Sequence, residues 1–162
     1  MNRKEKITLG IEAEMNFLIS GFLNGLCAWL IYRGSPFVPV DFWSRFIDTT
    51  ITCFLVSVCT AFFSTASAKR YRRQGLRVMS GKGRCKCSEA LPEAALPAGC
   101  CLFGMCLPLL IALFTVIFYA AGVEALSVVQ YVIFKGIWGG LYGALICTVV
   151  LMKHLMVKDE QV

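Results

Sequence analysis

Residues 100–121 read CCLFGMCLPLLIALFTVIFYAA, an apolar stretch without a single charged side chain. As an α-helix, at about 1.5 Å per residue, this stretch spans about 33 Å, enough to cross a bilayer whose hydrocarbon core is about 30 Å thick. Inside that core a helix satisfies its own backbone hydrogen bonds, whereas an irregular segment does not. The stretch therefore predicts a transmembrane helix.

Three more apolar stretches have a comparable length: residues 15–32, 46–68 and 128–152. Of all residues in the chain, 57% are hydrophobic, above the roughly 45–50% that is typical of soluble domains. We predict an all-α fold, a four-helix transmembrane bundle that makes residues 1–162 a single integral membrane domain. The alternative is a re-entrant element in one half. The first stretch is the shortest, so we expect its helix to begin earlier, near Ile7.

A cleaved signal peptide is a second interpretation of the first stretch. Its apolar part is longer than the usual core of about 7–15 residues, and no small-x-small cleavage site precedes Arg33. We therefore expect an uncleaved membrane span.

The distribution of Lys and Arg predicts the orientation, because basic residues are retained in the cytoplasm. Residues 69–86 hold eight basic side chains and no acidic one. Basic residues also precede the first span and follow the last, Arg3 and Lys153 among them. The opposite side has Arg33 and few other charges. We expect both termini and the linker, residues 69–99, to lie in the cytoplasm.

This orientation groups the spans into two hairpins, the first with the second and the third with the fourth. We expect the basic half of the linker to attract the anionic headgroups of the lipid bilayer. Four apolar residues in it favour a short amphipathic helix on the membrane surface. They are Tyr71, Leu76, Val78 and Met79.

Small residues mark where helices pack closely in lipid. Six glycines are the candidate packing positions: Gly21, Gly25, Gly136, Gly139, Gly140 and Gly143. The first, second and fourth spans also carry most polar side chains, so we expect them to form the interior and the third span to be the most lipid-exposed. Residues 21–31 and 136–146 match at two glycines, two leucines and an isoleucine, which we attribute to the limited residue types of membrane helices.

Four polar positions stand out within the spans: Asn24, Asp48, Thr52 and Lys135. They predict either a polar cavity or plain helix packing. Charges inside a span are costly, so they need partners. Asp48 lies about one turn inside the external end of its span and Lys135 about two turns inside its own. Their similar depth and opposite sign favour an ion pair; the alternative is that each side chain reaches the interface separately.

The nine cysteines do not predict a metal site. Cys85 and Cys87 fall in the linker, and Cys100 and Cys101 at the cytoplasmic mouth of the third span. A C-x-C pair followed by adjacent cysteines fits structural zinc poorly, and the only histidine, His154, is far along the chain. We expect thiols that stay free in a reducing cytoplasm, lipid-modified or unmodified, and no cofactor.

Catalytic motifs are missing from the sequence: there is no Gly-rich phosphate loop, no H-E-x-x-H and no nucleophile elbow. We therefore do not expect an enzyme. The basic stretch does not predict nucleic-acid binding either, because lipid headgroups and topology explain it.

Short motifs in both halves resemble a loose group of small bacterial four-span membrane proteins, mostly labelled hypothetical or, without a mechanism, permease. The residues that carry the resemblance are Asn24, Trp29, Arg33-Gly34 and Asp48, then Gly122-Val123-Glu124-Ala125-Leu126-Ser127 and Lys135-Gly136. The resemblance implies the four-span fold and a bacterial cytoplasmic membrane. It implies no catalytic or binding residue.

Together these features predict a small permease-like or transport-associated membrane protein. Four spans make a small bundle, so we expect a homo-oligomer or a membrane protein partner. The alternative is a non-transporting accessory or scaffold subunit of a larger membrane complex. Transport predicts a water-accessible polar lining, whereas a scaffold predicts a dry, tightly packed interior.

Overall fold

The computed structural model describes residues 3–75 and 91–155. Its elements are α1 (Arg3–Tyr32), β1 (Phe37–Pro39), α2 (Phe42–Arg73), α4 (Ala95–Ala121), β2 (Ala125–Ser127) and α5 (Val128–Leu155). Within the described residues, four helices are long and apolar enough to cross a membrane. The predicted all-α fold with four candidate spans is confirmed.

The helices extend beyond the apolar stretches that predicted them. α1 begins at Arg3, earlier than the expected Ile7, and α2 runs from Phe42 to Arg73. The start of α2 is fixed by Asp41, whose carboxylate accepts the backbone N–H groups of Trp43 and Ser44 at 3.1 Å each. Apolarity alone did not show this cap, so the predicted boundary fell too late.

The linker is shorter than residues 69–99, because α2 continues through Arg73 and α4 already begins at Ala95. Residues 76–90 lie outside the described part of the chain. The predicted surface helix therefore falls largely outside it, as do Cys85 and Cys87.

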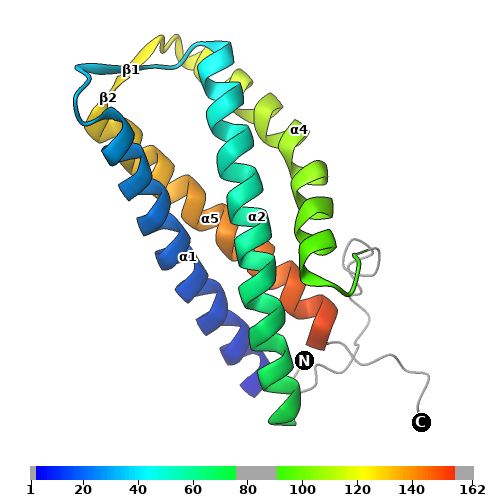
Figure 1. The fold of residues 1–162 in the computed structure, drawn as a ribbon. Helices are drawn as coiled ribbons and strands as arrows, with labels where there is room; N and C mark the ends of the chain where they lie inside the picture. Colours follow the sequence, from blue (N-terminus) through cyan, green and yellow to red (C-terminus); the bar gives the residue numbers. More distant parts are fainter. Residues whose placement is uncertain (1–2, 76–90, 156–162) are drawn as a thin grey trace.

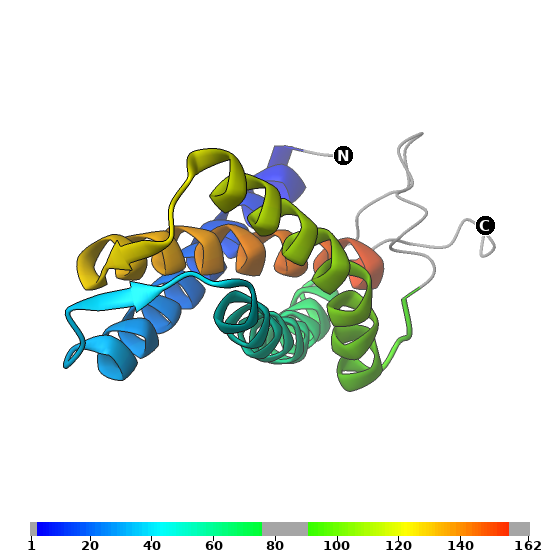
Figure 2. The same cartoon turned by 90° about the horizontal axis from the view of Figure 1, so that it is seen from above.

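Helix packing crosses between the two halves of the chain. α1 packs mainly on α5, and α2 packs on both α4 and α5, whereas α1 and α2 touch at few positions. In Figure 1, α5 passes diagonally behind α2, from the strands down to the foot of α4; Figure 2 shows the same crossing from above. The predicted pairing of the spans into two hairpins, the first with the second and the third with the fourth, is not shown by these contacts. Small residues on α1 and α5 allow these two helices, one from each half of the chain, to pack closely on each other.

The degree of burial also differs from the expectation. α5 is the most buried of the four helices, and α1 is as little buried as α4. The third span is therefore not alone at the lipid-facing periphery. The polar side chains of α1 lie on one narrow face towards α5, which leaves the rest of that helix apolar and exposed.

Two short strands join the two loops at the end of the molecule opposite the helix ends at residues 73 and 95 (Figure 1). β1 and β2 are antiparallel, with Phe37 opposite Ser127 and Val38 opposite Leu126. The side chain of Val38 is only 1% exposed. We call this end of the molecule the strand end.

The two halves share one order of elements, helix, strand, helix, and equivalent contacts. α1 on α5 corresponds to α4 on α2, while α2 meets α5 and β1 meets β2. The arrangement is that of an approximate two-fold axis between α2 and α5. Asp48 follows the end of β1 by nine residues, and Lys135 follows the end of β2 by eight. The fold therefore brings these two side chains to the same depth.

Candidate functional site

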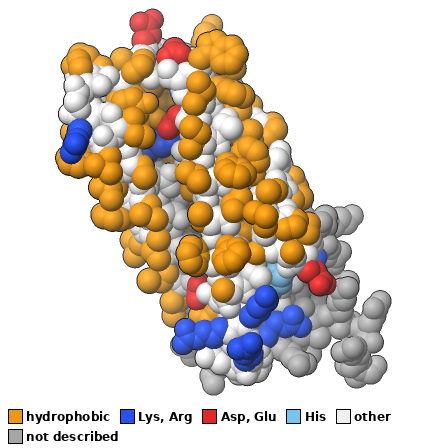
Figure 3. Space-filling model, in the orientation of Figure 1, with side chains coloured by type: hydrophobic (Ala, Val, Ile, Leu, Met, Phe, Trp, Pro, Cys, Tyr) orange, Lys and Arg blue, Asp and Glu red, His pale blue; other side chains and the backbone are white. Residues whose placement is uncertain are grey.

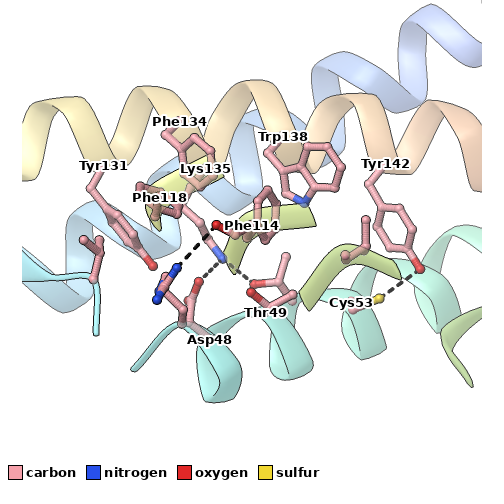
Figure 4. Close-up of a pocket in the computed structure, with 14 residues that line it drawn as sticks. Asp48, Thr49, Cys53, Phe114, Phe118, Tyr131, Phe134, Lys135, Trp138 and Tyr142 are labelled. Carbon is pink, nitrogen blue, oxygen red and sulfur yellow. Dashed lines mark hydrogen bonds and ion pairs between the residues drawn. The ribbon is translucent and has the colours of Figure 1, made fainter. Parts of the chain in front are cut away.

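Asp48 of α2 and Lys135 of α5 form an ion pair between two of the candidate membrane spans. The Lys135 Nζ atom donates to Asp48 Oδ2 at 2.6 Å and to Thr52 Oγ1 at 2.5 Å (Figure 4). The Lys135 side chain is only 6% exposed and that of Asp48 27%. The ion pair predicted from the opposite charges and similar depth of the two residues is therefore present. The Lys135 side chain does not extend separately to the membrane–water interface.

A cavity lies beside the ion pair, between α2, α4 and α5. Its volume is about 20 Å³, which leaves room for about one water molecule. Asp48, Thr52 and Lys135 form its polar wall. Aromatic side chains of α4 and α5 form the opposite wall: Phe114, Phe118, Phe134 and Trp138 (Figure 4).

These aromatic rings are the main contact between α4 and α5. Phe114 packs edge-on against Trp138, with 4.7 Å between ring centroids, and against Phe134 at 5.4 Å. Phe118 contacts Phe134 at the same centroid distance. The backbones of the two helices do not pack closely, unlike those of α1 and α5. The aromatic wall therefore spans a wide gap between helices, and the cavity lies in that gap.

Arg45 of α2 forms the rim of the cavity and is partly buried. Its Nη1 atom donates to the Phe114 carbonyl oxygen at 3.3 Å, and its guanidinium lies 5.4 Å from the centre of the Phe118 ring. Arg45 therefore connects the start of α2 to α4.

Tyr142 of α5 closes the cavity towards the middle of the bundle. Its hydroxyl lies 2.6 Å from Ser57 Oγ and accepts a hydrogen bond from Cys53 Sγ at 3.0 Å (Figure 4). Ser57 and Cys53 are buried on α2. Beyond Tyr142, the α2–α5 contact is therefore packed and its polar groups are paired.

Asn24 does not belong to this site. Its Nδ2 atom donates to the Ser20 carbonyl oxygen of its own helix at 2.7 Å, and its side chain packs against Gly139 of α5. It does not line the cavity. Of the four predicted polar positions, Asp48, Thr52 and Lys135 meet, and Asn24 lies in a different interface.

The six predicted packing glycines all lie where α1 meets α5. A Cβ atom added at Gly21 would come within 2.7 Å of the Gly136 carbonyl oxygen, and one at Gly140 within 2.8 Å of the Phe17 carbonyl oxygen. Added Cβ atoms at Gly25 and Gly136 would meet neighbours at 3.5 and 3.4 Å. The similar segments 21–31 and 136–146 are therefore partners across one interface.

A second polar contact joins α1 to α2 at the end opposite the strands. The Tyr71 hydroxyl donates to Glu12 Oε1 at 2.5 Å. Near it, Asn16 of α1 donates to Cys147 Sγ of α5 at 3.1 Å. Polar links therefore tie α2 to α5 near the strands and α2 to α1 at the far end.

The structure also places residues in the site that the sequence did not single out: Arg45, Tyr142 and the aromatic side chains of α4. The signal for Phe114 and Phe118 was their four-residue spacing, which puts both on one face of a helix. That signal was hidden because every other position nearby is apolar too. Nothing in the sequence linked Tyr142 to Ser57, since they are 85 residues apart.

Metal ligands do not converge in the described residues, where no group of three or more His, Cys, Asp or Glu side chains comes together. Cys100 is exposed and Cys101 is partly buried at the start of α4. Their relation to Cys85 and Cys87 falls outside the described residues.

Comparison of the chain with models of protein families, with curated proteins and with solved structures gave no match. The geometry of the ion pair and its cavity is therefore what a functional assignment has to start from.

Proposed function

We propose that the chain is a small permease-like or transport-associated membrane protein whose polar working site is the cluster of Asp48, Thr52 and Lys135. The observation that carries the proposal is an ion pair inside a candidate membrane span that also lines a cavity. Ionisable residues at such depth are costly, and they commonly mark ion or substrate pathways. The proposal includes no catalytic step and no cofactor.

The proposal includes an orientation, with the strand end outside a bacterial cell and the opposite end in the cytoplasm. The last turn of α2 carries Arg70, Arg72 and Arg73, and that of α5 carries Lys153. Figure 3 shows Lys and Arg gathered at this lower end of the visible face. We propose that these residues lie against anionic headgroups of the inner leaflet.

Reporter fusions after Gly75 and after Glu124 test this orientation. We expect an enzyme that is active only in the cytoplasm to work at Gly75 and to fail at Glu124. A reporter that works only outside should give the reverse pattern. Identical results at both positions would contradict the four-span topology.

A transport cycle needs more than the conformation described here, because the cavity holds only about one water molecule. We propose that the chain works as a homo-oligomer or with a membrane protein partner. Movement of α4 away from α5 would widen the cavity, since aromatic side chains rather than close backbones join these helices.

Accessibility of the cavity to water tests the function. The experiment introduces Thr49→Cys, which lines the cavity, into a chain whose nine native cysteines are replaced. The matched control is Asn24→Cys, in the α1–α5 interface. We expect a membrane-impermeant thiol reagent added at the strand end to modify the cysteine at position 49 about tenfold faster than the cysteine at position 24, as an opening cavity requires.

A non-transporting accessory or scaffold subunit is the second candidate. The observation in its favour is the close glycine packing of α1 on α5, which leaves no space for water at that interface. If positions 49 and 24 are equally unreactive, the interior is dry and the scaffold function replaces the transport function.

A further inference from the structure

The cavity carries one positive charge that no acidic side chain balances. Its charged lining residues are Arg45, Asp48 and Lys135, and Asp48 is paired with Lys135. Arg45 forms no ion pair with any carboxylate in the described residues. Its hydrogen bonds go to the carbonyl oxygens of Asp41 and Phe114, which are neutral groups. The guanidinium at the rim therefore remains available to an anion.

Arg45 lies near the start of α2, where the acidic side chain of Asp41 is engaged by the helix it caps. Arg45 is the fourth residue of α2, and the N-terminus of a helix bears about half a positive charge. The first turn of α2 has no acidic residue. The nearest further acid, Asp41, caps the helix: its carboxylate accepts hydrogen bonds from the Trp43 and Ser44 N–H groups and the Ser44 hydroxyl. The Asp41 carboxylate offsets the positive end of the helix, so an approaching anion interacts chiefly with the Arg45 guanidinium itself.

The rest of the cavity wall suits an apolar group. Phe114 and Phe118 lie beside Arg45, and Phe134 and Trp138 continue the aromatic wall along α5. A small hydrophilic anion would make no apolar contact with these rings. Once the cavity widens by movement of α4 away from α5, an anion with a hydrocarbon chain would contact Arg45 and the rings at once.

We propose that this site binds the anionic headgroup of an amphiphile, a phosphate or a carboxylate, with Arg45 as its charge partner and the aromatic wall against its chain. The inference rests on the proposed function and names the substrate class of the same cavity. Arg45 suits this role because its planar fork of N–H donors matches the oxygens of phosphate and carboxylate. Arg45 lies close to the strand end, one turn from the start of α2, where the headgroup of an outer-leaflet lipid would be.

The test measures protection of the cavity by a defined amphiphile. The full chain with replaced cysteines and Thr49→Cys is reconstituted in phosphatidylcholine vesicles, and an uncharged, membrane-impermeant thiol reagent modifies it from the strand end. Dodecyl phosphate is then added. We expect it to slow modification at position 49 at least about fivefold, as high occupancy of the site requires. A Ser35→Cys chain, exposed in the loop before β1, corrects for effects at the vesicle surface.

Matched arginine variants show whether Arg45 holds the headgroup. Arg45→Gln should need about tenfold more dodecyl phosphate for the same protection, and Arg45→Lys, which keeps the charge without the fork, should need an intermediate amount. In the Arg33→Gln variant, dodecyl phosphate should protect position 49 as well as before, because Arg33 lies 5.6 Å over the Trp29 ring and does not line the cavity. Equal protection in Arg45→Gln and Arg33→Gln would overturn the assignment. An unchanged rate of labelling at position 49 before dodecyl phosphate is added shows that each variant keeps the folded cavity.

Two other probes separate the chemical classes. Dodecyltrimethylammonium, a cation with the same hydrocarbon tail, should give no protection. Protection by it would show that the tail binds without an anionic headgroup and would overturn the proposal. Inorganic phosphate should protect position 49 far less than dodecyl phosphate does. Equal protection would indicate that the site binds a free anion and would overturn the proposal of an amphiphile. If position 49 reacts but dodecyl phosphate does not protect it, the inference fails while the transport function stands. If position 49 never reacts, both fail.

Discussion

Lys135 is held by two oxygen atoms from one helix. Asp48 and Thr52 are four residues apart on α2, so both side chains lie on the same face and reach the same ammonium group. A single lysine on α5 therefore fixes both the rotation and the depth of α2. Because the pair is largely desolvated, either charge left alone would be more costly than the pair.

Single and double replacements measure this coupling. Asp48→Asn or Lys135→Met alone should lower the free energy of unfolding, because the remaining charge loses its partner. The double variant should recover much of the loss, with a coupling energy of about 1 kcal/mol or more. Unfolding of the purified protein in detergent measures all four members of the cycle. Additive losses would show two independent side chains. Recovery of stability without recovery of transport would assign the pair a functional role.

The sequence was sufficient to predict the Asp48–Lys135 contact, because charge sign and depth restrict a buried ion to few partners. It was not sufficient for Arg45, because nothing in the sequence distinguished this arginine from the other charges near the ends of the spans. For Asn24 the sequence left a polar cavity and helix packing as alternatives, and the structure shows helix packing. Its spacing put it on the polar face of α1, but nothing in the sequence said that this face meets the glycines of α5 rather than α2.

The α1–α5 interface depends on backbones that approach closely. Gly21 and Gly140 each lie where a methyl group would overlap a carbonyl oxygen of the other helix. In lipid, such close packing replaces the hydrophobic effect as the force that holds helices together. α1, which has few contacts with α2, depends on this interface almost entirely.

Gly21→Ala tests the interface with a single methyl group. The added Cβ would lie 2.7 Å from the Gly136 carbonyl oxygen, so we expect a loss of about 1–3 kcal/mol in unfolding free energy, typical of overpacking. The control is Gly104→Ala in α4, where an added Cβ meets nothing within 4 Å. That variant should be neutral or more stable, because alanine favours the helix. Similar losses in both variants would mean that the close approach of α1 and α5 is not the cause of the loss at Gly21.

The start of α2 should respond to pH through Asp41. The hydrogen bond from the Ser44 hydroxyl lowers the pKa of the Asp41 carboxyl, and backbone N–H groups add to the effect. A folded-state pKa below the unfolded value means that the cap stabilises α2 above the unfolded pKa and is lost as pH falls through the folded one. Thermal unfolding of wild type and Asp41→Asn should therefore differ less in acid than at neutral pH. A difference that stays constant with pH would exclude the carboxylate as the cause.

The molecule as a whole is built from two similar halves that exchange helices. Each half, helix–strand–helix, leaves its first helix without a partner of its own and supplies a surface for the first helix of the other. Element number and type followed from apolar length, but this exchange could not be predicted. Short loops suggest that helices adjacent in sequence pack on each other. The glycine faces of α1 and α5 favour a different pairing, and their fit is evident only when the two helices are seen together. The β1–β2 pairing was missed because each strand is only three residues long.

Separate halves should therefore complement each other. Fragments 1–83 and 84–162, produced together, should copurify, because α1 needs α5 and α4 needs α2. Each fragment produced alone should be degraded or should self-associate. Gly21→Leu in the first fragment should prevent copurification, and Gly104→Leu in the second should not. Two fragments that are stable and monomeric alone would show that each half packs by itself.

The exchange of helices also has a consequence in time. Val128, where α5 begins, follows Tyr32, where α1 ends, by 96 residues. At about 5–20 residues per second, the ribosome finishes the first helix some 5–20 s before the start of its partner emerges. During that interval Asn16 and the glycine face of α1 lack the surface they fit. Each new copy is therefore half assembled for this interval, with the glycine face of its first helix still uncovered.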